Sequence, residues 1–386
     1  MSKRACGIVA HRIPIDLVVD ILVWLPAKSV LRFKCVCKEW YNLINNNPLF
    51  PKLHLNKSLE LNSQHNNCIL YWTTSILCVV DNLYDHPPPV KVTKLNWPIT
   101  IEDDDCIRQV GSCNGLVCFN VTAMPSNRIR SFLICNLTTR TFKSIFPPSE
   151  KIREHWLADD SVLYSFSYDS QHDDYKIVVT RRYWTEDDRD GHIFIYSLKT
   201  NLWTSSYSPL TRISTEGRWS NICQAIFGHN MLHYLVSFET TKGFIQDNRI
   251  ARFDVADEKW TDDLSLPNQV KSILRLGKLD GRLYVHDSAI IWVMEEDGSW
   301  NKMFQLPKDL DSHHLIACSK DGRQRLLLQD YNGHGSVLKW YDQQNNKRIP
   351  LKLKPPPQDR SAVMLCTASL IRIPGCSLTK LQEMKE

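Results

Sequence analysis

The sequence lacks a segment that could cross a membrane as a helix or direct the chain to the secretory pathway. Its longest mostly apolar stretch, residues 68–80, has thirteen residues, whereas a membrane-spanning helix needs about 20. Lys3 and Arg4 resemble the basic start of a signal peptide, but no apolar run follows them before Arg12. We therefore expect a soluble protein in the cytoplasm, or in both the cytoplasm and the nucleus.

Motifs that bind metals or cofactors are also missing. The thirteen cysteines include no C-x-x-C pair, and a structural zinc site needs four ligands in two tight pairs. No glycine-rich phosphate-binding loop is present. We expect no cofactor and no metal ion, and we expect the cysteines to be small buried apolar side chains in a reducing compartment.

Most of the chain lacks the excess of positive charge that marks a nucleic-acid-binding face. Of 386 residues, 47 are Lys or Arg and 42 are Asp or Glu, which gives a net charge of +5. Residues 1–50 hold +4 of this charge, from seven basic and three acidic residues, so the remaining 336 residues carry +1. We expect neither a nucleic acid nor a membrane as partner.

Residues 13–47 have the spacing of three short amphipathic helices, because apolar residues recur there every three or four positions. Pro14 suits a helix start, Pro26 ends the first helix, and Ser29 is a candidate N-cap of the second. Three helices in about 35 residues cannot bury all these side chains, so the module needs a partner surface. Residues 1–12 are expected to form a tail, and residues 48–66, with Pro48, Pro51 and many Asn, a linker.

From about residue 67 the pattern changes to short β-strands. Segments rich in β-branched and aromatic residues alternate with turn signals, and no long amphipathic helix is expected after residue 50. Two of the signals are the dipeptides Asn114-Gly115 and Asp280-Gly281. Such dipeptides favour the tight turns of β-hairpins.

One unit recurs in this β-rich part: a short strand, a polar turn, an aromatic residue and then a proline. The aromatic positions are Phe142, Trp203, Trp260 and Trp300, and a fifth copy has Arg348 instead. Their spacings of 61, 57, 40 and 48 residues are typical of β-propeller blades. Residues 67–375 would form about six blades, with five or seven as alternatives and a β-sandwich as the less favoured architecture. Residues 376–386 are expected to be a polar tail.

Candidate catalytic groups are few. Residues 111–115 match a G-x-C-x-G nucleophile elbow around Cys113, but that motif needs a helix after the nucleophile, and a second strand is expected here. His229 and His233 are spaced like metal ligands on a helix, yet their segment alternates like a strand. The pair His313-His314 fits a strand start better than a metal site. We therefore expect a binding protein that is not itself an enzyme.

Acidic clusters recur in the expected loops, at residues 102–105, 159–160, 173–174, 186–188 and 295–297. One explanation is solubility, and the other is a rim that attracts a basic partner by electrostatic steering. Under the second explanation, the candidate target-binding residues are Glu102, Asp103, Asp104, Asp105, Glu186, Asp187 and Asp188.

Residues 13–44 resemble a plant F-box. The matching run reads I-P-x-D-L-V-x-D-I-L-x-x-L-P-x-K-S-V-L-R-F-K-C-V-C-K-x-W-x-x-L-I. The later part resembles the F-box-associated, kelch-like β-propeller of the same plant family, in residues 112–118, 168–170, 174–178, 253–255, 291–294 and 299–300. The resemblance therefore implies a small all-α F-box module followed by an all-β, kelch-like propeller. Within this family the sequence is similar to the S-locus F-box group.

This resemblance implies a non-catalytic substrate receptor of an SCF (Skp–cullin–F-box) E3 ubiquitin ligase. The F-box would bind a Skp-type adaptor that docks on cullin and RING subunits, and the propeller would hold a protein target for ubiquitination and proteasomal degradation. The S-locus similarity implies basic S-ribonucleases in self-incompatibility as targets. The alternative is an F-box/propeller scaffold with a different target or an adaptor-independent role. The expected adaptor-binding residues are Pro14, Leu17, Ile21, Leu22, Leu25, Pro26, Leu31, Val36 and Trp40.

Overall fold

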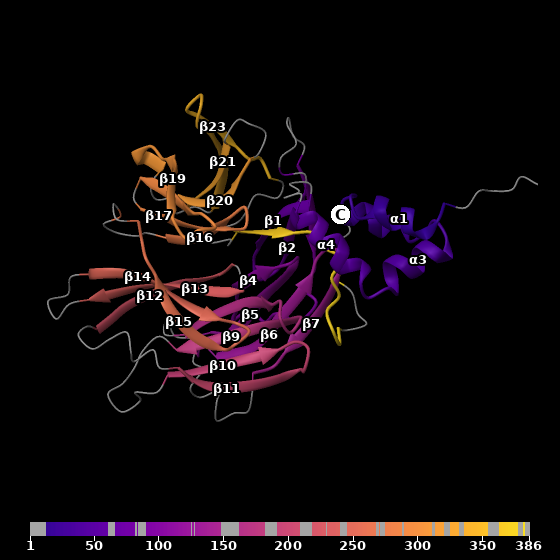
Figure 1. The fold of residues 1–386 in the computed structure, drawn as a ribbon, viewed down its shortest axis with the longest axis horizontal. Coiled ribbons are helices and arrows are strands. Elements are labelled where there is room, and N and C mark those ends of the chain that lie inside the picture. Colours follow the sequence, from indigo (N-terminus) through magenta and orange to yellow (C-terminus); the bar gives the residue numbers. More distant parts are fainter. Residues whose placement is uncertain are drawn as a thin grey trace, which may run out of the picture.

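The chain folds into a small helical module attached to one side of a β-propeller (Figure 1). The computed structural model describes residues 13–60, 66–81, 83, 90–124, 126, 128–147, 162–181, 191–208, 218–228, 230–239, 245–267, 270, 275–287, 289–310, 313–319, 325–331, 336–353, 363–376 and 381–382.

The first three helices confirm the helical prediction for residues 13–47. They are α1 (Ile15–Leu22), α2 (Ala27–Phe33) and α3 (Lys38–Asn45). Pro14 and Pro26 precede α1 and α2 as their N-cap residues, so Ser29 lies inside α2 and does not cap it. The Cys37 side chain accepts a hydrogen bond from the Trp40 N–H at the start of α3.

A fourth helix, α4 (Phe50–Glu60), occupies most of the segment predicted to be a linker. The linker prediction is therefore wrong. Pro51 is compatible with the helix because it lies in the first turn, where its missing N–H costs nothing. The Asn47 side chain caps the helix by accepting hydrogen bonds from the N–H groups of Leu49 and Phe50. One side of α4 is buried at helical spacing: Phe50, Pro51, His54, Leu55 and Ser58.

The β-rich part forms six antiparallel four-stranded sheets, which confirms the predicted propeller of about six blades. From one edge of its sheet to the other, blade 1 contains β24 (Val363–Thr367), β1 (Asn67–Trp72), β2 (Leu77–Asp81) and β3 (Lys91–Leu95). Blade 2 contains β4 (Asp105–Cys113), β5 (Leu116–Ala123), β6 (Arg128–Asn136) and β7 (Thr141–Ile145). Blade 3 contains β8 (Val162–Asp169), β9 (Asp174–Arg181), β10 (Gly191–Ser197) and β11 (Leu202–Ser208).

The remaining blades repeat this pattern. Blade 4 contains β12 (Arg218–Gly228), β13 (Met231–Glu239), β14 (Ile245–Asp254) and β15 (Lys259–Leu264). Blade 5 contains β16 (Arg275–Leu279), β17 (Arg282–His286), β18 (Ile290–Met294) and β19 (Trp300–Gln305), and the 3₁₀ turn η3 (Lys308–Leu310) follows it. Blade 6 contains β20 (His314–Cys318), β21 (Arg325–Tyr331), β22 (Ser336–Asp342) and β23 (Lys347–Pro350).

The last strand closes the ring. β24 pairs with β1, so blade 1 combines strands from both ends of the propeller, and Cys68 lies directly opposite Cys366 with their sulfur atoms 3.0 Å apart. The first strand of each blade contacts the first strand of the next, in the order β24, β4, β8, β12, β16, β20 and back to β24. Ring closure leaves no long exposed sheet edge between the first and last blades.

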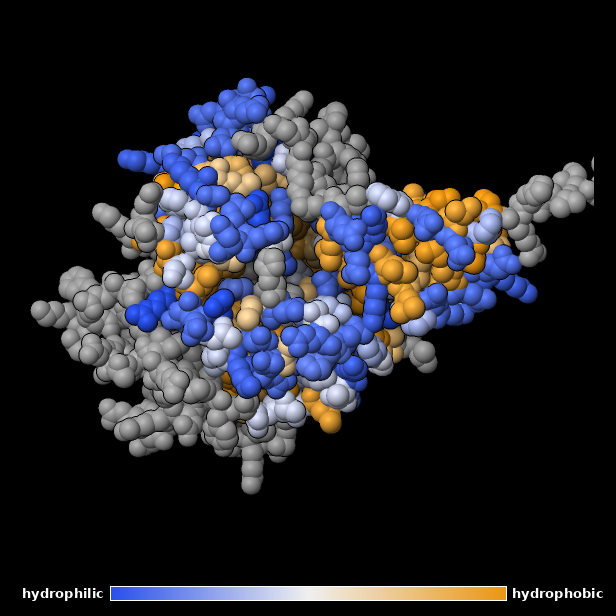
Figure 2. Space-filling model, viewed as in Figure 1, coloured by the Kyte–Doolittle hydropathy of each residue, from blue (hydrophilic) through white to orange (hydrophobic). Residues whose placement is uncertain are grey.

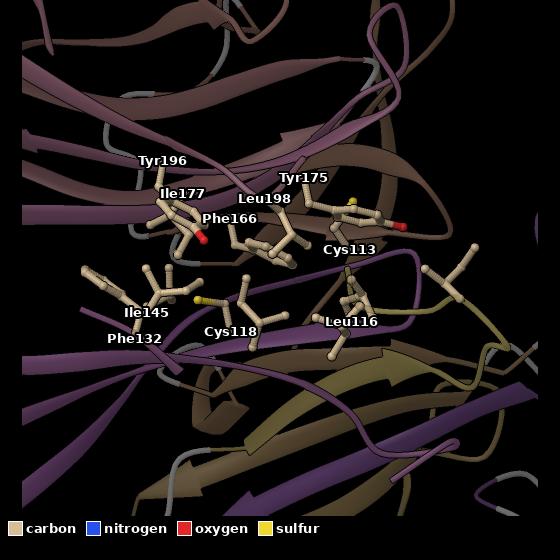
Figure 3. Close-up of a cluster of buried hydrophobic side chains, with 14 of the residues drawn as sticks. Cys113, Leu116, Cys118, Phe132, Ile145, Phe166, Tyr175, Ile177, Tyr196 and Leu198 are labelled. Carbon is tan, nitrogen blue, oxygen red and sulfur yellow. The ribbon is translucent and has the colours of Figure 1, made fainter. Parts of the chain in front are cut away.

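Apolar side chains from facing sheets fill the spaces between neighbouring blades. Figure 3 shows the cluster between blades 2 and 3, in which Cys118 and Phe132 face Phe166 and Ile177. All four residues are at most 3% exposed. Such clusters explain why the strands of both blades have apolar residues on both faces.

Two of the recurring aromatic residues, Trp203 and Trp300, tie the outermost strand of their blade to the blade before it. Trp203 of blade 3 donates its indole N–H to the carbonyl of Phe146, which follows blade 2, and Trp300 of blade 5 donates to Ser265, which follows blade 4. Arg348 makes the equivalent contact in blade 6, where its guanidinium pairs with Asp309 at 2.5 Å. The substitution of arginine for an aromatic residue in the fifth copy therefore replaces one link between blades with another.

The two faces of the propeller carry different connections. The turns between first and second strands, such as Asn114-Gly115 and residues 170–173, lie near α4, because Lys52 of α4 pairs with Asp173. Asn114 and Gly115 both have positive φ, as do Asp280 and Gly281, which confirms the predicted hairpins. Strands alternate in direction, so the loops that join one blade to the next lie on the opposite face.

The chain after β24 runs back between the propeller and the helical module. Asn136 of blade 2 donates hydrogen bonds from its side-chain amide to the carbonyls of Ser369 and Ile371, at 3.1 and 2.7 Å. Further on, Leu381 is buried, and its N–H donates to the carbonyl of Arg140. The prediction of a polar tail from residue 376 is therefore wrong at Leu381, which the apolar cluster between blades 1 and 2 holds in place.

Candidate functional site

The helical module exposes a group of apolar side chains, which are orange in Figure 2. Within residues 13–47, five large apolar side chains are more than half exposed: Ile13 (59%), Leu17 (52%), Ile21 (54%), Trp24 (57%) and Val36 (58%). Water-exposed apolar groups gathered on one surface of a soluble protein are typical of a protein-binding site. This surface is therefore the candidate functional site.

Helical spacing places three of these side chains on one face of α1 and the turn after it. Leu17, Ile21 and Trp24 follow each other by four and three residues, so they lie on one side of the helix and of the turn after it. Val18 and Leu22, on the other side, are buried in the core of the module. The same periodicity therefore produces both the core and the exposed face.

The nine predicted adaptor-binding residues divide into three groups by exposure. Pro14, Leu17, Ile21, Pro26 and Val36 are exposed, whereas Leu25, Leu31 and Trp40 are half-buried. Trp40 packs edge-to-face against Phe33, with ring centroids 5.7 Å apart. Leu22 is fully buried, so its assignment to the binding surface is corrected: it is a core residue.

Within residues 13–47, the prediction missed four exposed large apolar residues: Ile13, Ile15, Trp24 and Tyr41. The signal for Trp24 was available, because it continues the spacing of Leu17 and Ile21. The other three gave no comparable signal, since an apolar residue near a helix end is compatible with either burial or exposure.

Polar contacts and shared core residues fix the helical module to the propeller. Lys28 of α2 pairs with Asp81 of β2 at 2.5 Å, and the Ala27 N–H donates to the Asn66 side chain at 3.1 Å. Ala368 and Leu370, which follow β24, belong to the same buried cluster as the helices. Movement of the module relative to the propeller would break these contacts, so the two parts form one unit.

His54 joins α4 to the turn after α1 within the helical module. Its side chain is fully buried, and its Nε2 lies 2.8 Å from the carbonyl of Leu25. Burial lowers the pKa of His54 despite that hydrogen bond. The neutral ring therefore donates from Nε2 to the carbonyl that ends the turn after α1.

The acidic loop at residues 102–105 carries its own basic partner. Arg130 of β6 lies 2.6 Å from Glu102, 3.9 Å from Asp104 and 3.1 Å from Asp105. The hydrogen bond and charge of Arg130 lower the pKa of Glu102. Asp105 is buried, and it also accepts a hydrogen bond from the Glu102 N–H. Its assignment as a target-binding residue is therefore corrected, because it holds the loop in shape.

The other predicted acidic residues are placed as follows. Asp103 and Asp104 are exposed on the propeller face opposite α4. Residues Glu186, Asp187 and Asp188 lie outside the described part of the chain. Asp173 pairs with Lys52 and Glu295 with Arg282. In each of the described acidic clusters, at least one carboxylate therefore lies in an ion pair.

The candidate catalytic groups occupy structural positions. Cys113 ends β4 at a hairpin, as expected from the sequence, and burial raises the pKa of its thiol to about 12. His233 is buried on β13, His314 begins β20, and His229 lies outside the described residues. Within the described ranges, His, Cys, Asp and Glu residues form no group of three or more that could hold a metal ion. Over the same ranges, no helix is long and apolar enough to span a membrane.

These observations define a class: a six-bladed propeller that rigidly holds a helical module with an exposed apolar face. Comparison with known proteins identifies the family. Residues 11–52 match the F-box domain, and residues 68–351 match the F-box associated beta propeller domain. The chain belongs to the family of F-box proteins that carry this propeller, a combination typical of SCF substrate receptors.

Similar proteins are known from Arabidopsis thaliana. The chain is 27% identical to F-box protein CPR1, over 97% of this chain and 92% of that protein. It is 26% identical to F-box/kelch-repeat protein At3g23880, over 77% of this chain and 80% of that protein. Among solved structures, the β-propeller domain of the Trilobed protease from Pyrococcus furiosus shares 15% identity and a TM-score of 0.34, over 65% of this chain and 72% of that one.

Proposed function

We propose that this chain is the substrate receptor of an SCF-type ubiquitin ligase. Its helical module binds a Skp-type adaptor, which connects it to a cullin and a RING subunit, and its propeller binds a protein target. The exposed apolar face of α1 supports this proposal most strongly, because Leu17, Ile21 and Trp24 are all more than half exposed. The receptor itself performs no chemistry, and its location is cytoplasmic, or cytoplasmic and nuclear.

The rigid junction between module and propeller suits this role. A ubiquitin ligase gains its rate by holding a target lysine near the ubiquitin-charged enzyme, and orientation of this kind can be worth about 7–11 kcal/mol in well-ordered cases. A freely moving receptor would lose part of that advantage. The Lys28–Asp81 ion pair and the shared apolar core keep the propeller at a fixed position relative to the adaptor.

We place the target on the propeller face opposite α4. The short turns near α4 are covered by the helical module, whereas the connections between blades lie on the free face. The exposed carboxylates of Asp103 and Asp104 lie there. A basic S-ribonuclease is the finer proposal for this target, and Asp103 and Asp104 are exposed carboxylates that would attract a basic protein. Arg130 pairs with Glu102 and Asp105 and so reduces the negative charge of this loop.

The experiment is affinity purification of the full chain from plant cells under proteasome inhibition, followed by mass spectrometry. The wild type is compared with a Leu17→Asp/Ile21→Asp variant, because both side chains are exposed and their replacement leaves the core intact. We expect adaptor and cullin with the wild type only, and targets with both forms. Absence of adaptor and cullin from the wild type would contradict the proposal and favour an adaptor-independent scaffold.

A further inference from the structure

A cleft of about 430 Å³ lies where α2 meets blades 1 and 2. α2 forms one wall, β2 and β3 of blade 1 form another, and the turn between β6 and β7 of blade 2 forms the third. Volumes of about 300–1,000 Å³ are typical of pockets that bind small molecules. The cleft is separate from the exposed face of α1, since Leu17, Ile21 and Trp24 do not line it.

Positive charge predominates in the lining of this cleft. Lys28 and Arg32 are one helical turn apart on α2, and Arg140 ends the turn between β6 and β7. Among the described residues that line the cleft, Asp81 is the only acidic one. The lining therefore has an excess of two positive charges.

Hydrogen bonds and an ion pair fix the walls of the cleft. The Asn136 side chain accepts a hydrogen bond from the Thr138 N–H at 2.9 Å, in the turn that carries Arg140. The ion pair between Lys28 and Asp81, at 2.5 Å, ties α2 to β2. A site that is shaped before its ligand arrives has a lower entropic cost of binding.

The rest of the lining suits an organic molecule with an anionic group. Ser29 and Thr93 line the cleft, and their hydroxyl groups can donate hydrogen bonds to anionic oxygens. Apolar residues complete the lining: Pro26, Leu31, Val79, Leu95 and Leu137. These apolar side chains provide a surface for a carbon skeleton.

The amount of positive charge favours a phosphate over a single carboxylate. A phosphate monoester carries a charge of about −1.5 to −2 at pH 7, which matches the excess in the cleft. A carboxylate carries a single negative charge. Arginine also presents its N–H groups in a planar fork that fits the oxygens of a phosphate.

We propose that this cleft binds a small organic phosphate. Arg32 and Arg140 hold the phosphate group from opposite walls, and the apolar residues of the lining contact the carbon skeleton. The bound molecule contacts α2 and two blades at once, so it stabilises the junction between the helical module and the propeller. This site is independent of the proposed function, because neither an adaptor nor a target takes part in it.

The test is calorimetric titration of the purified full chain with phenyl phosphate. Arg32→Gln/Arg140→Gln removes two positive charges from the cleft, and Lys38→Gln/Lys302→Gln is the matched control, which removes two from exposed positions outside it. We expect the first variant to bind phenyl phosphate at least about tenfold more weakly than the wild type, and the control to differ by less than about twofold.

Two further comparisons separate the contribution of charge from that of folding. Benzoate has the same ring with one negative charge, and we expect it to bind at least about fivefold more weakly than phenyl phosphate. Arg32→Lys/Arg140→Lys keeps both charges and should restore most of the affinity. Far-UV circular dichroism and thermal unfolding establish that each variant is folded.

Three results would overturn this proposal. The first is the absence of saturable binding of phenyl phosphate by the wild type at concentrations up to about 10 mM. The second is equal affinity of the wild type and Arg32→Gln/Arg140→Gln, which would place any binding outside the cleft. The third is binding of benzoate as tight as that of phenyl phosphate, which would exclude selection for a phosphate.

Discussion

Lys176 of blade 3 is the centre of a buried ionic network that joins blades 3 and 4. Its ammonium group lies 3.1 Å from Asp169, 2.9 Å from Glu258 and 2.8 Å from the carbonyl of Val255. The Asp169 side chain is fully buried, and that of Lys176 is 8% exposed. Burial alone would raise the pKa of Asp169, but hydrogen bonds from His172 and Lys176 outweigh it and hold the pKa below its usual value.

Replacing Lys176 with methionine would leave this carboxylate without its cation. Breaking a buried ion pair from one side typically costs about 3–5 kcal/mol. We expect a smaller loss here, about 2–3 kcal/mol, because Asp169 keeps hydrogen bonds from the N–H groups of Gln171 and His172 and from the His172 ring. For a chain of 386 residues that loss corresponds to a fall of about 2–5 °C in the thermal midpoint.

Urea denaturation and thermal unfolding measure this effect. The double variant Lys176→Met/Asp169→Asn removes both charges, so it should lose less stability than the sum of the two single variants. Lys302→Met, at an exposed position of β19, is the control and should change stability by less than about 0.5 kcal/mol. A cost below about 1 kcal/mol for Lys176→Met, or strict additivity in the double variant, would refute the reasoning.

Three further predictions concern the packing around Gly277, the segment after β24 and the dependence of stability on pH. Gly277→Ala should destabilise the protein by about 1–3 kcal/mol, because a Cβ there would lie 2.3 Å from the Tyr284 ring, which is buried between blades 5 and 6. Asn136→Ala should cost about 2–3 kcal/mol and accelerate amide exchange in residues 368–373, which its side chain holds. Burial and the positive charge of Arg275 lower the pKa of His314 to about 4. The unfolded histidine titrates near 6.5, so stability should fall as the pH drops from about 6.5 toward 4, and less so in His314→Gln.

Each of these three predictions has a result that contradicts it. Gly281→Ala is the control for Gly277→Ala, because nothing lies within 4 Å of that position and only its positive φ opposes a side chain; equal costs at both glycines would exclude close packing as the cause. Unchanged exchange in residues 368–373 of Asn136→Ala would show that other contacts hold the segment. A pH profile of stability identical in His314→Gln and wild type would remove His314 as its source.

Local patterns in the sequence were sufficient to predict the helices of residues 13–47 and the propeller. Apolar spacing defined α1 to α3, since each of these helices must bury one side. The recurring aromatic residues defined the blades, and two of them, Trp203 and Trp300, tie their outer strands to the preceding blade. Even the exception at Arg348 has the same role, through its ion pair with Asp309.

Features that depend on distant parts of the chain could not be predicted in this way. α4 has a weak sequence signal, because its buried side packs partly against the propeller and its asparagine and proline residues resemble those of a linker. The pairing of β24 with β1 joins residues about 300 positions apart. Leu22 and Asp105 were assigned to surfaces although both are buried. The spacing of Leu22, four residues after Val18, is compatible with burial, whereas the burial of Asp105 beside Arg130 depends on a partner that sequence spacing does not identify.

The measurement that tests the central claim most directly is the affinity of a purified Skp-type adaptor for the full chain and two variants. Ile21→Asp changes the exposed face of α1, and Leu202→Asp changes a residue of similar exposure, 62% against 54%, on the propeller. The account predicts that Ile21→Asp weakens binding about 30-fold or more and that Leu202→Asp binds like the wild type. Equal binding by all three proteins, or no binding by any of them, would contradict it.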